Sequence, residues 1–431
     1  MSLRQNALVL AVLVALVAIL GAWSGDASLA HAWYFPLALL LLGLAYERWA
    51  VSRADLTVAL ESQPRGVLGR ASDLYLKFQH RLNRTTQVEL APEAPAVVEI
   101  DSSIRTFEVP QEGAHTQLRI VPRRLGDHAW PSLRARIAGP LGLAWWGRRL
   151  SAEFRLHVIP EHLEGAGRAS GAVSAGQRAR AMLGAGSEIM QLREYRPGDA
   201  QNSIDWKASA RTGKLVSRDF LEDQHLEIVI AIDVGRSSAL RAGTLDRLGH
   251  YANLAARFAQ HAVAQDDRIG LILFADRPIA AVAPDRGLNA VARIRRVLTA
   301  SKPVQAESNP LNAALRIRSL VRHRSFVVLL TDLDDVTLAG QLASAARLLL
   351  PKHLPLIASI GSPEAEHMRY RPALNWLDPY ESLAAQEYSS QLDRNVRALR
   401  ALGAPALIAR PEHLERAVFD AYDEFRRKRR I

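Results

Sequence analysis

The sequence predicts three structural parts: two N-terminal transmembrane helices, a small β-sandwich-like domain, and a doubly wound α/β domain. Three observations support this division. Two uncharged apolar runs open the chain, short alternating strands follow them, and from about residue 225 apolar strands alternate with long helical stretches. A chain of 431 residues also exceeds what one hydrophobic core usually organises.

Residues 1–53 are predicted to form a transmembrane helical hairpin, with spans at about 7–23 and 30–46. Both runs lack charged residues apart from a histidine at position 31, and each is close to the length that crosses a bilayer. A cleaved signal peptide is the alternative, because Arg4 gives a basic start and small residues flank His31. The second apolar run favours the hairpin, because cleavage would leave that run unexplained.

Basic residues near the two spans predict their orientation. Arg4 precedes the first span, and the connecting loop contains Asp26 but no lysine or arginine. Four arginines follow the second span: Arg48, Arg53, Arg65 and Arg70. Because basic residues close to spans stay on the cytoplasmic side, we expect both termini in the cytoplasm.

The formal net charge is +11, and the run Arg426–Arg430 supplies five of these charges. This run is interpreted either as a solvated helix end or as a contact with anionic lipid. Nucleic-acid binding is not expected, because no basic motif with interleaved aromatic residues occurs. The absence of cysteine excludes disulfides and thiolate metal sites.

Residues 54–160 show β-branched residues, approximate alternation and regular Pro/Gly punctuation, which predicts a small β-sandwich. Residues 161–192 are rich in Gly, Ala and Ser and are predicted to be a flexible linker or loop. Residues 225–431 contain five apolar strands separated by helices, a pattern typical of a parallel sheet covered on both faces. Ligands of such sheets bind beyond the carboxyl ends of the strands.

Two of these strands end in aspartate, at Asp233 and Asp332. Asp233, Gly235 and Ser237 alternate along an extended segment, so their side chains would point the same way. Mg²⁺ prefers oxygen ligands and retains waters, so these residues predict a possible metal site. The alternative is that Asp233 and Asp332 cap the loops and helices that follow them.

No catalytic constellation is evident in the sequence. There is no Gly-x-Ser-x-Gly elbow, Walker A loop or dinucleotide glycine pattern, and the histidines are scattered. Asp334 and Asp335 are expected to start a helix, where anionic side chains suit the N-terminus. A phosphohydrolase that holds Mg²⁺ on Asp233 and Asp332 remains an alternative.

Residues 193–224 begin with a polar segment that contains a Pro-Gly turn. We expect Asp199 to cap a short helix over about 200–208 and Trp206 to anchor the segment on the domain. Neighbouring ion pairs are predicted to make a structural network. Its predicted members are Arg193, Arg196, Lys207, Arg211 and Arg218 with Glu194, Asp199, Asp205 and Asp219.

This segment resembles the signature of the bacterial domain-of-unknown-function 58 (DUF58) family, and residues 139–149 ("GPLGLAWWGRR") resemble the end of that family's β-region. The segment from about Leu226 onward resembles a von Willebrand factor A domain, whose metal motif is Asp-x-Ser-x-Ser with a later Thr and Asp. Gly235 departs from the first Ser, and Asn309 stands near the expected Thr. The matching signature residues are Arg193, Tyr195, Gly198, Asp199, Ile204, Asp205, Trp206, Ser209, Ala210 and Arg211.

The resemblance implies a protein of the bacterial inner membrane that acts with a MoxR-type AAA+ ATPase, in a family for which no enzymatic activity is established. The leading hypothesis is therefore a membrane-anchored adaptor that binds this ATPase or its client proteins, with a Mg²⁺ bridge on Asp233, Ser237, Asn309 and Asp332. The alternatives are the phosphohydrolase and an extracytoplasmic adhesion module, which requires the opposite topology.

Overall fold

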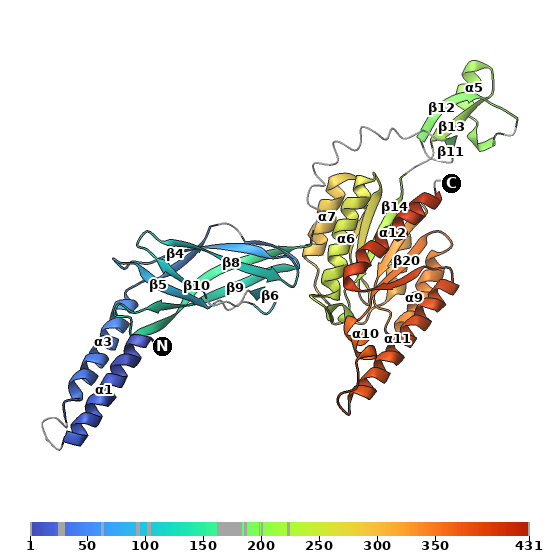
Figure 1. The fold of residues 1–431 in the computed structure, drawn as a ribbon. Helices are drawn as coiled ribbons and strands as arrows, with labels where there is room; N and C mark the ends of the chain where they lie inside the picture. Colours follow the sequence, from blue (N-terminus) through green and yellow to red (C-terminus); the bar gives the residue numbers. More distant parts are fainter. Residues whose placement is uncertain are drawn as a thin grey trace. The chain divides into compact units, whose positions relative to one another are not determined.

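The chain divides into two compact units, Met1–Ile159 and Pro160–Ile431 (Figure 1). The computed structural model describes residues 2–24, 31–61, 64–91, 95–100, 105–161, 183–184, 188–197, 199, 201–221 and 225–429. The predicted loop at Asp26, most of the predicted linker, Gly198 and Arg430 lie outside these described residues.

The two predicted apolar helices are present as α1 (Gln5–Ser24) and α3 (Tyr34–Ser52). Both are long and apolar enough to cross a membrane, with mean hydropathy of 2.5 and 1.2 over their most apolar windows. Most of their side chains are exposed within the unit, as expected of helices whose apolar surface faces lipid. A signal sequence satisfies the same criteria of length and composition.

The rest of the first unit consists of two β-sheets. One has the strand order β1-β10-β9-β5-β7, with β3 added beside β10, and the other has the order β2-β4-β8-β6. The sheets pack against each other, since the rings of Phe78 on β4 and Phe107 on β7 lie 5.1 Å apart. The strands are β1 (Ser2–Leu3), β2 (Thr57–Leu60), β3 (Arg65–Val67), β4 (Ser72–Gln79), β5 (Thr86–Ala91), β6 (Val98–Ile100), β7 (Arg105–Val109), β8 (Ala114–Pro122), β9 (Gly126–Ala138) and β10 (Ala144–Ile159).

Glu47 joins α3 to the turn between β9 and β10. Its buried carboxylate accepts hydrogen bonds from the backbone N–H groups of Leu141 and Leu143, each at 2.9 Å. It also accepts from the Ala144 N–H at 3.0 Å and from the Trp146 indole at 3.3 Å. This contact gives the "GPLGLAWW" motif a structural role, which the sequence did not reveal.

The second unit contains a six-stranded sheet of order β18-β17-β14-β19-β20-β21. Five strands are parallel, but β18 pairs antiparallel with β17, so the expectation of a wholly parallel sheet is corrected at this edge. The reason is the short β17–β18 connection, which forms a hairpin in which the Ala275 N–H bonds the Arg277 carbonyl. The strands are β14 (Glu227–Asp233), β17 (Arg268–Phe274), β18 (Pro278–Asp285), β19 (Ser325–Leu330), β20 (Leu354–Ile360) and β21 (Ala406–Ala409).

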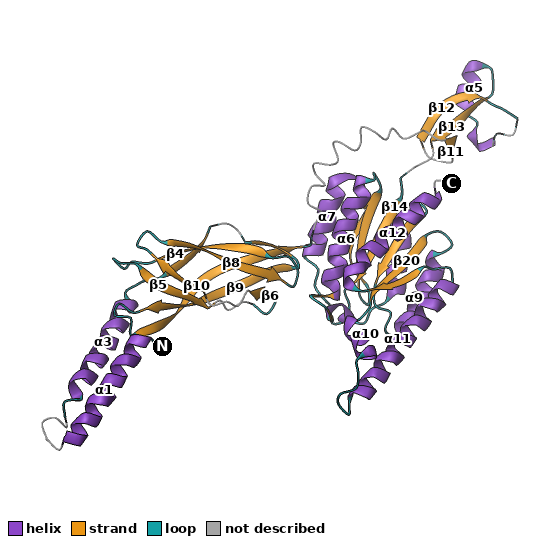
Figure 2. Cartoon of the chain, in the orientation of Figure 1, coloured by secondary structure: helices purple, strands orange, loops and turns teal. Residues whose placement is uncertain are grey.

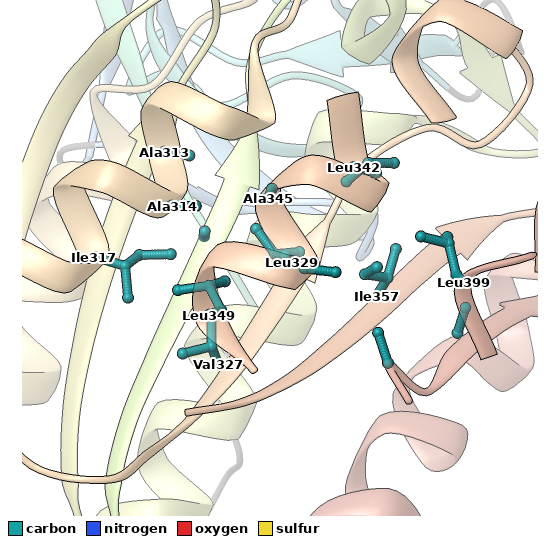
Figure 3. Packing of buried hydrophobic residues seen from close by; sticks show 14 of the residues in the cluster. Ala313, Ala314, Ile317, Val327, Leu329, Leu342, Ala345, Leu349, Ile357 and Leu399 are labelled. Carbon is teal, nitrogen blue, oxygen red and sulfur yellow. The ribbon is translucent and has the colours of Figure 1, made fainter. Parts of the chain in front are cut away.

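Helices cover both faces of this sheet (Figure 2). Alternate strand residues such as Val327 and Leu329 pack against the helices of one face (Figure 3). On the other face, the ring of Phe326 lies 6.2 Å from that of Tyr422. The helices are α6 (Arg247–Ala264), α7 (Gly287–Thr299), α8 (Pro310–Leu320), α9 (Val336–Leu349), α10 (Pro363–Tyr370), α11 (Asp378–Ala401) and α12 (Pro411–Arg429).

A separate three-stranded sheet, of order β11-β13-β12, contains the family signature. Its strands are β11 (Leu183–Gly184), β12 (Glu188–Glu194) and β13 (Val216–Leu221), so the predicted linker 161–192 contains strand residues near its end. Two short helices, η1 (Gln201–Ser203) and α5 (Trp206–Thr212), connect β12 to β13.

The helix predicted over 200–208 begins later than expected. Its N-cap is Asp205, whose carboxylate accepts from the Ala208 N–H at 3.0 Å, and not Asp199. The reason is that Ile204 forms an isolated β-bridge with Ser217, and the Asp205 N–H bonds the Val216 carbonyl. Because residues 204 and 205 pair with β13, α-helical geometry starts only at Trp206.

Candidate functional site

The candidate site lies where β14 and β19 end. These strands are parallel neighbours with Ile232 opposite Leu330, so Asp233 and Thr331 leave the sheet at the same edge. Asp332 follows directly. The strand ends therefore bring the two predicted aspartates to one region, as parallel pairing requires.

Asp233 is almost completely buried, with 1% of its surface exposed. One carboxylate oxygen accepts from the Gly235 N–H at 2.8 Å and from the Ser308 hydroxyl, and the other accepts from the Thr331 hydroxyl at 2.7 Å. Burial raises the pKa of Asp233, although these three hydrogen bonds oppose the rise. Asp233 is thus the centre of a hydrogen-bonded network of strand ends.

Gly235 is required by this network. A Cβ at position 235 would lie 2.3 Å from the Ser308 hydroxyl oxygen and 3.0 Å from the Asp233 carboxylate. Ser308 therefore occupies the space that a side chain at position 235 would need. The sequence did not reveal Ser308 or Thr331, because neither lies within the spacing of a recognisable motif.

The other two predicted metal ligands have different surroundings. Asn309 is the N-cap of α8, where its side-chain oxygen accepts from the Asn312 N–H at 3.2 Å. Ser237 lies half-buried in η2 (Arg236–Ala239), the short helix that follows Asp233. The side-chain oxygen of Asn309 is therefore already used to begin a helix.

A buried arginine neutralises Asp332. Arg247 is the first residue of α6 and is 6% exposed, and its guanidinium forms ion pairs with Asp332 and, at 2.7 Å, with Asp334. The Tyr388 hydroxyl on α11 donates to Asp334 at 2.6 Å. Asp335, as predicted, caps the next helix by accepting from the Thr337 N–H, whereas Asp334 belongs to the arginine cluster instead.

The predicted magnesium ligands do not fit a metal ion in this arrangement. Both Asp233 oxygens accept from protein donors, the Asp332 carboxylate faces a guanidinium, and Asn309 caps a helix. Within the described ranges, no three His, Cys, Asp or Glu side chains are grouped to hold a metal. Arg247 places a positive charge beside Asp332 and Asp334. The phosphohydrolase alternative, which needs Asp233 and Asp332 to share a metal, gains no support from these donors.

Part of the predicted ion-pair network in the signature segment is present. Arg193 donates two hydrogen bonds to Asp199, at 2.8 and 2.9 Å, and this contact together with the Arg196 N–H lowers the pKa of Asp199 to about 2. The Tyr195 hydroxyl donates to the Asp199 carbonyl, and Ser209 bonds the Asp205 carbonyl and the Val216 N–H. Further pairs join Lys214 to Glu194 and Arg218 to Asp205.

Two side chains of this segment are more exposed than their predicted roles require. Trp206 is 68% exposed, so it is not an apolar anchor within its unit. Arg211 is also exposed, and among the described residues it forms no ion pair. Both side chains belong to α5, and the Asp205 cap and the Ser209 contacts hold that helix against β13 without them.

The comparisons with known proteins agree with the signature. The sequence model of the family described as "Protein of unknown function DUF58" matches residues 191–369. This match supports the DUF58 family. It includes the signature segment and every residue of the Asp233 network. No curated protein matches the chain.

The chain has distant likenesses among solved structures. "Conserved hypothetical protein BatB" from Bacteroides thetaiotaomicron is 15% identical with a TM-score of 0.27, and the match covers 41% of this chain and 98% of that chain. The alpha-2-macroglobulin of E. coli is 18% identical with a TM-score of 0.20, covering 25% and 7% respectively. At these TM-scores neither likeness bears on fold or function.

Two histidines within residues 191–369 have structural surroundings. The His250 imidazole bonds the Ala242 carbonyl, and burial lowers its pKa. His353 is buried at the opposite, amino end of β20, away from the two aspartates. Asp233, Arg247 and Asp332 are buried at the strand-end edge, whereas Arg236 and Glu307 form an exposed ion pair there.

Proposed function

We propose that the protein is a membrane-anchored adaptor that binds a MoxR-type AAA+ ATPase, or a client of that ATPase, through the strand-end edge of its α/β domain. The observation that carries this proposal is the Arg247 cluster. Arg247 holds the loop after β19 to α6, so the edge is shaped in advance of any partner. Preformed surfaces bind partners with a smaller entropic cost.

The fold supports the same interpretation. The sheet has its first strand, β14, in the middle, an antiparallel strand at one edge, and Asp233 at the end of that middle strand. We propose that this is a von Willebrand factor A-like domain in which Arg247 takes the place of the metal ion. Binding through the strand-end edge follows the general behaviour of open α/β sheets.

The proposed location is the bacterial inner membrane, with both termini in the cytoplasm. The support is the pair of apolar helices and the arginines on either side of them. Protease treatment of spheroplasts tests this orientation. A protected C-terminal unit is expected, whereas cleavage from outside would favour the extracytoplasmic adhesion module.

The partner proposal is tested with a charge swap at the strand-end edge. Arg236 and Glu307 are exposed there and form an ion pair at 2.6 Å. Arg236→Glu combined with Glu307→Arg keeps this ion pair but exchanges the positions of its positive and negative charges. The matched control is Asp285→Arg with Arg293→Asp, an exposed pair at the opposite edge of the same sheet.

Full-length variants are purified from native membranes in mild detergent, and the co-purified ATPase is measured. We expect the strand-end swap to lower recovery at least about tenfold, because like-charge contacts at an interface cost several kcal/mol. The control swap should leave recovery unchanged. Equal recovery with both swaps would show that the partner does not use this edge.

A further inference from the structure

The segment between α10 and α11 exposes a cluster of large apolar side chains. The chain turns sharply there, and the turn projects from the α/β sheet (Figures 1 and 2). We call residues 368–383 the hairpin tip. Its apolar side chains are exposed by 40% to 81% and are Met368, Tyr370, Leu374, Trp376, Leu377, Tyr380 and Leu383. A contiguous exposed apolar cluster marks a surface that contacts a partner or a membrane.

The hairpin tip is held in shape by Asp378. This carboxylate is 7% exposed and accepts from the N–H groups of Leu374 and Asn375, both at 2.7 Å. These bonds to Asn375 and Leu374 lower the pKa of Asp378, so the carboxylate stays ionised. The Ser382 hydroxyl also bonds the Arg369 carbonyl. Side chains of the turn therefore form hydrogen bonds with some of its own backbone groups, while its apolar side chains stay exposed.

The shape and chemistry of the hairpin tip favour a lipid surface as its occupant. The cavity of about 470 Å³ in this unit lies elsewhere, between the amino ends of β19 and β20 and helix α12. Tyrosine and tryptophan collect where a bilayer meets water, because their rings have an apolar body and a polar edge. Arginines flank the rings: the Arg369 guanidinium lies 5.3 Å from the Tyr370 ring centre, and Arg371 follows.

We propose that the hairpin tip is a second membrane contact, in which Leu374, Trp376 and Tyr380 enter the headgroup region of a bilayer. Arg369 and Arg371 then lie close to anionic lipid headgroups. This inference rests on the membrane anchoring in the proposed function. A tethered second contact needs little affinity of its own, because the apolar helices keep the unit at a high effective concentration near the bilayer.

The absence of cysteine from the chain allows a site-specific test. Leu374→Cys is labelled with an environment-sensitive fluorophore in the full chain, which is reconstituted into phosphatidylcholine vesicles containing phosphatidylglycerol. The matched control is Leu288→Cys, an apolar residue of α7 that is 70% exposed. Quenching is measured with a nitroxide lipid and, separately, with aqueous iodide.

We expect the nitroxide lipid to quench the label at position 374 more than the label at 288, and iodide to quench it less. Arg369→Gln and Arg371→Gln should each lower the ratio of membrane-inserted to free hairpin tip about fivefold, because one cation near an anionic surface contributes about 1 kcal/mol. Equal quenching at both positions overturns the proposal. Protection from iodide without lipid quenching overturns it too, because a protein surface then covers the hairpin tip.

The same experiment separates this inference from the proposed function. If the chain floats with the vesicles but position 374 is not quenched by lipid, only the second membrane contact is wrong. If the chain does not incorporate into vesicles, the membrane anchoring fails and the inference fails with it.

Discussion

Glu47 in the first unit and Asp233 in the second are both buried carboxylates that lie beside a glycine. A Cβ at Gly139 would lie 2.1 Å from the Glu47 carboxylate, and a Cβ at Gly235 would lie 3.0 Å from that of Asp233. The donors differ. Glu47 accepts from three backbone N–H groups and an indole, whereas Asp233 accepts from one backbone N–H group and two hydroxyls.

This difference distinguishes a fixed structural contact at Glu47 from a network at Asp233 that can accommodate a change of protonation. Backbone N–H groups and indoles can only donate, so the contacts of Glu47 require a carboxylate acceptor. Hydroxyls can rotate and can either donate or accept, so the surroundings of Asp233 tolerate a change of protonation. The same pattern of a carboxylate beside a glycine thus fixes α3 to the β-sheets in one unit and ties strand ends together in the other.

The largest effect is expected from removing the Glu47 side chain. Glu47→Ala should cost the first unit more than about 5 kcal/mol, because it leaves four donors without an acceptor and each such donor costs about 1–3 kcal/mol. Thermal unfolding of the full chain in detergent, with limited proteolysis to identify the unit that opens, measures this. Glu61→Ala removes an exposed carboxylate that contacts His115 and serves as the control. A Glu47→Ala variant as stable as the control would show that Glu47 does not hold α3 to the β-sheets.

The next effect tests whether Arg247 replaces a metal ion. Arg247→Met leaves Asp332 and Asp334 without their cation and should cost about 3–5 kcal/mol, the usual loss when one partner of a buried pair is removed. Wild-type Tm should not respond to EDTA or Mg²⁺, while Mg²⁺ should raise the Tm of the variant. A wild-type Tm that falls on chelation would show that the metal prediction for Asp233 and Asp332 was correct.

A smaller effect concerns the Asp233 network and is seen in how the stability of the protein depends on pH. Asp233→Ala should cost about 1–3 kcal/mol through unpaired donors, whereas Asp233→Asn keeps most contacts because the Thr331 hydroxyl can accept instead. The folded pKa of Asp233 is raised above the ordinary 3.8, so its stabilisation is complete below that value and is lost as pH rises through the folded pKa. Urea unfolding across pH should show this loss in wild type and not in Asp233→Asn. If stability depends on pH in the same way in wild type and in Asp233→Asn, the raised pKa of Asp233 does not affect stability.

The smallest effect concerns the signature sheet. Arg193→Ala removes the paired contact with Asp199 and should speed amide hydrogen exchange in β12 and β13, while Arg211→Ala should not. The pKa of Asp199 is lowered to about 2, so this stabilisation is present above 3.8 and is lost as pH falls towards 2. If both variants exchange alike, the Arg193–Asp199 contact does not stabilise the signature sheet.

The regular elements of the chain could be predicted because their patterns are local. The run 228–232 is continuously apolar and forms the buried centre of β14, and apolar periodicity placed the helices that surround it. The start of α5 could not be predicted, because it depends on the pairing of Ile204 with Ser217 across the sheet. The position of Asp335 before an apolar helix was enough to predict its cap.

The candidate site was predictable only in part, for the same reason. Parallel strands ending in Asp233 and Asp332 predicted that the two carboxylates share an edge. Their partners come from segments distant in sequence: Arg247 lies 87 residues from Asp334, and Ser308 lies 75 residues from Asp233. No spacing rule connects such residues, so the sequence could not place Arg247 beside Asp332.

The sequence by itself determined the order of apolar helices, β-region and α/β region, because hydrophobic periodicity and turn residues act over a few positions. It also placed the signature that resembles the DUF58 family. Only the tertiary structure decided which donors surround Glu47 and Asp233 and which cation neutralises Asp332. Those choices depend on which distant segments are brought within hydrogen-bonding distance, and burial makes each such contact obligatory once it forms.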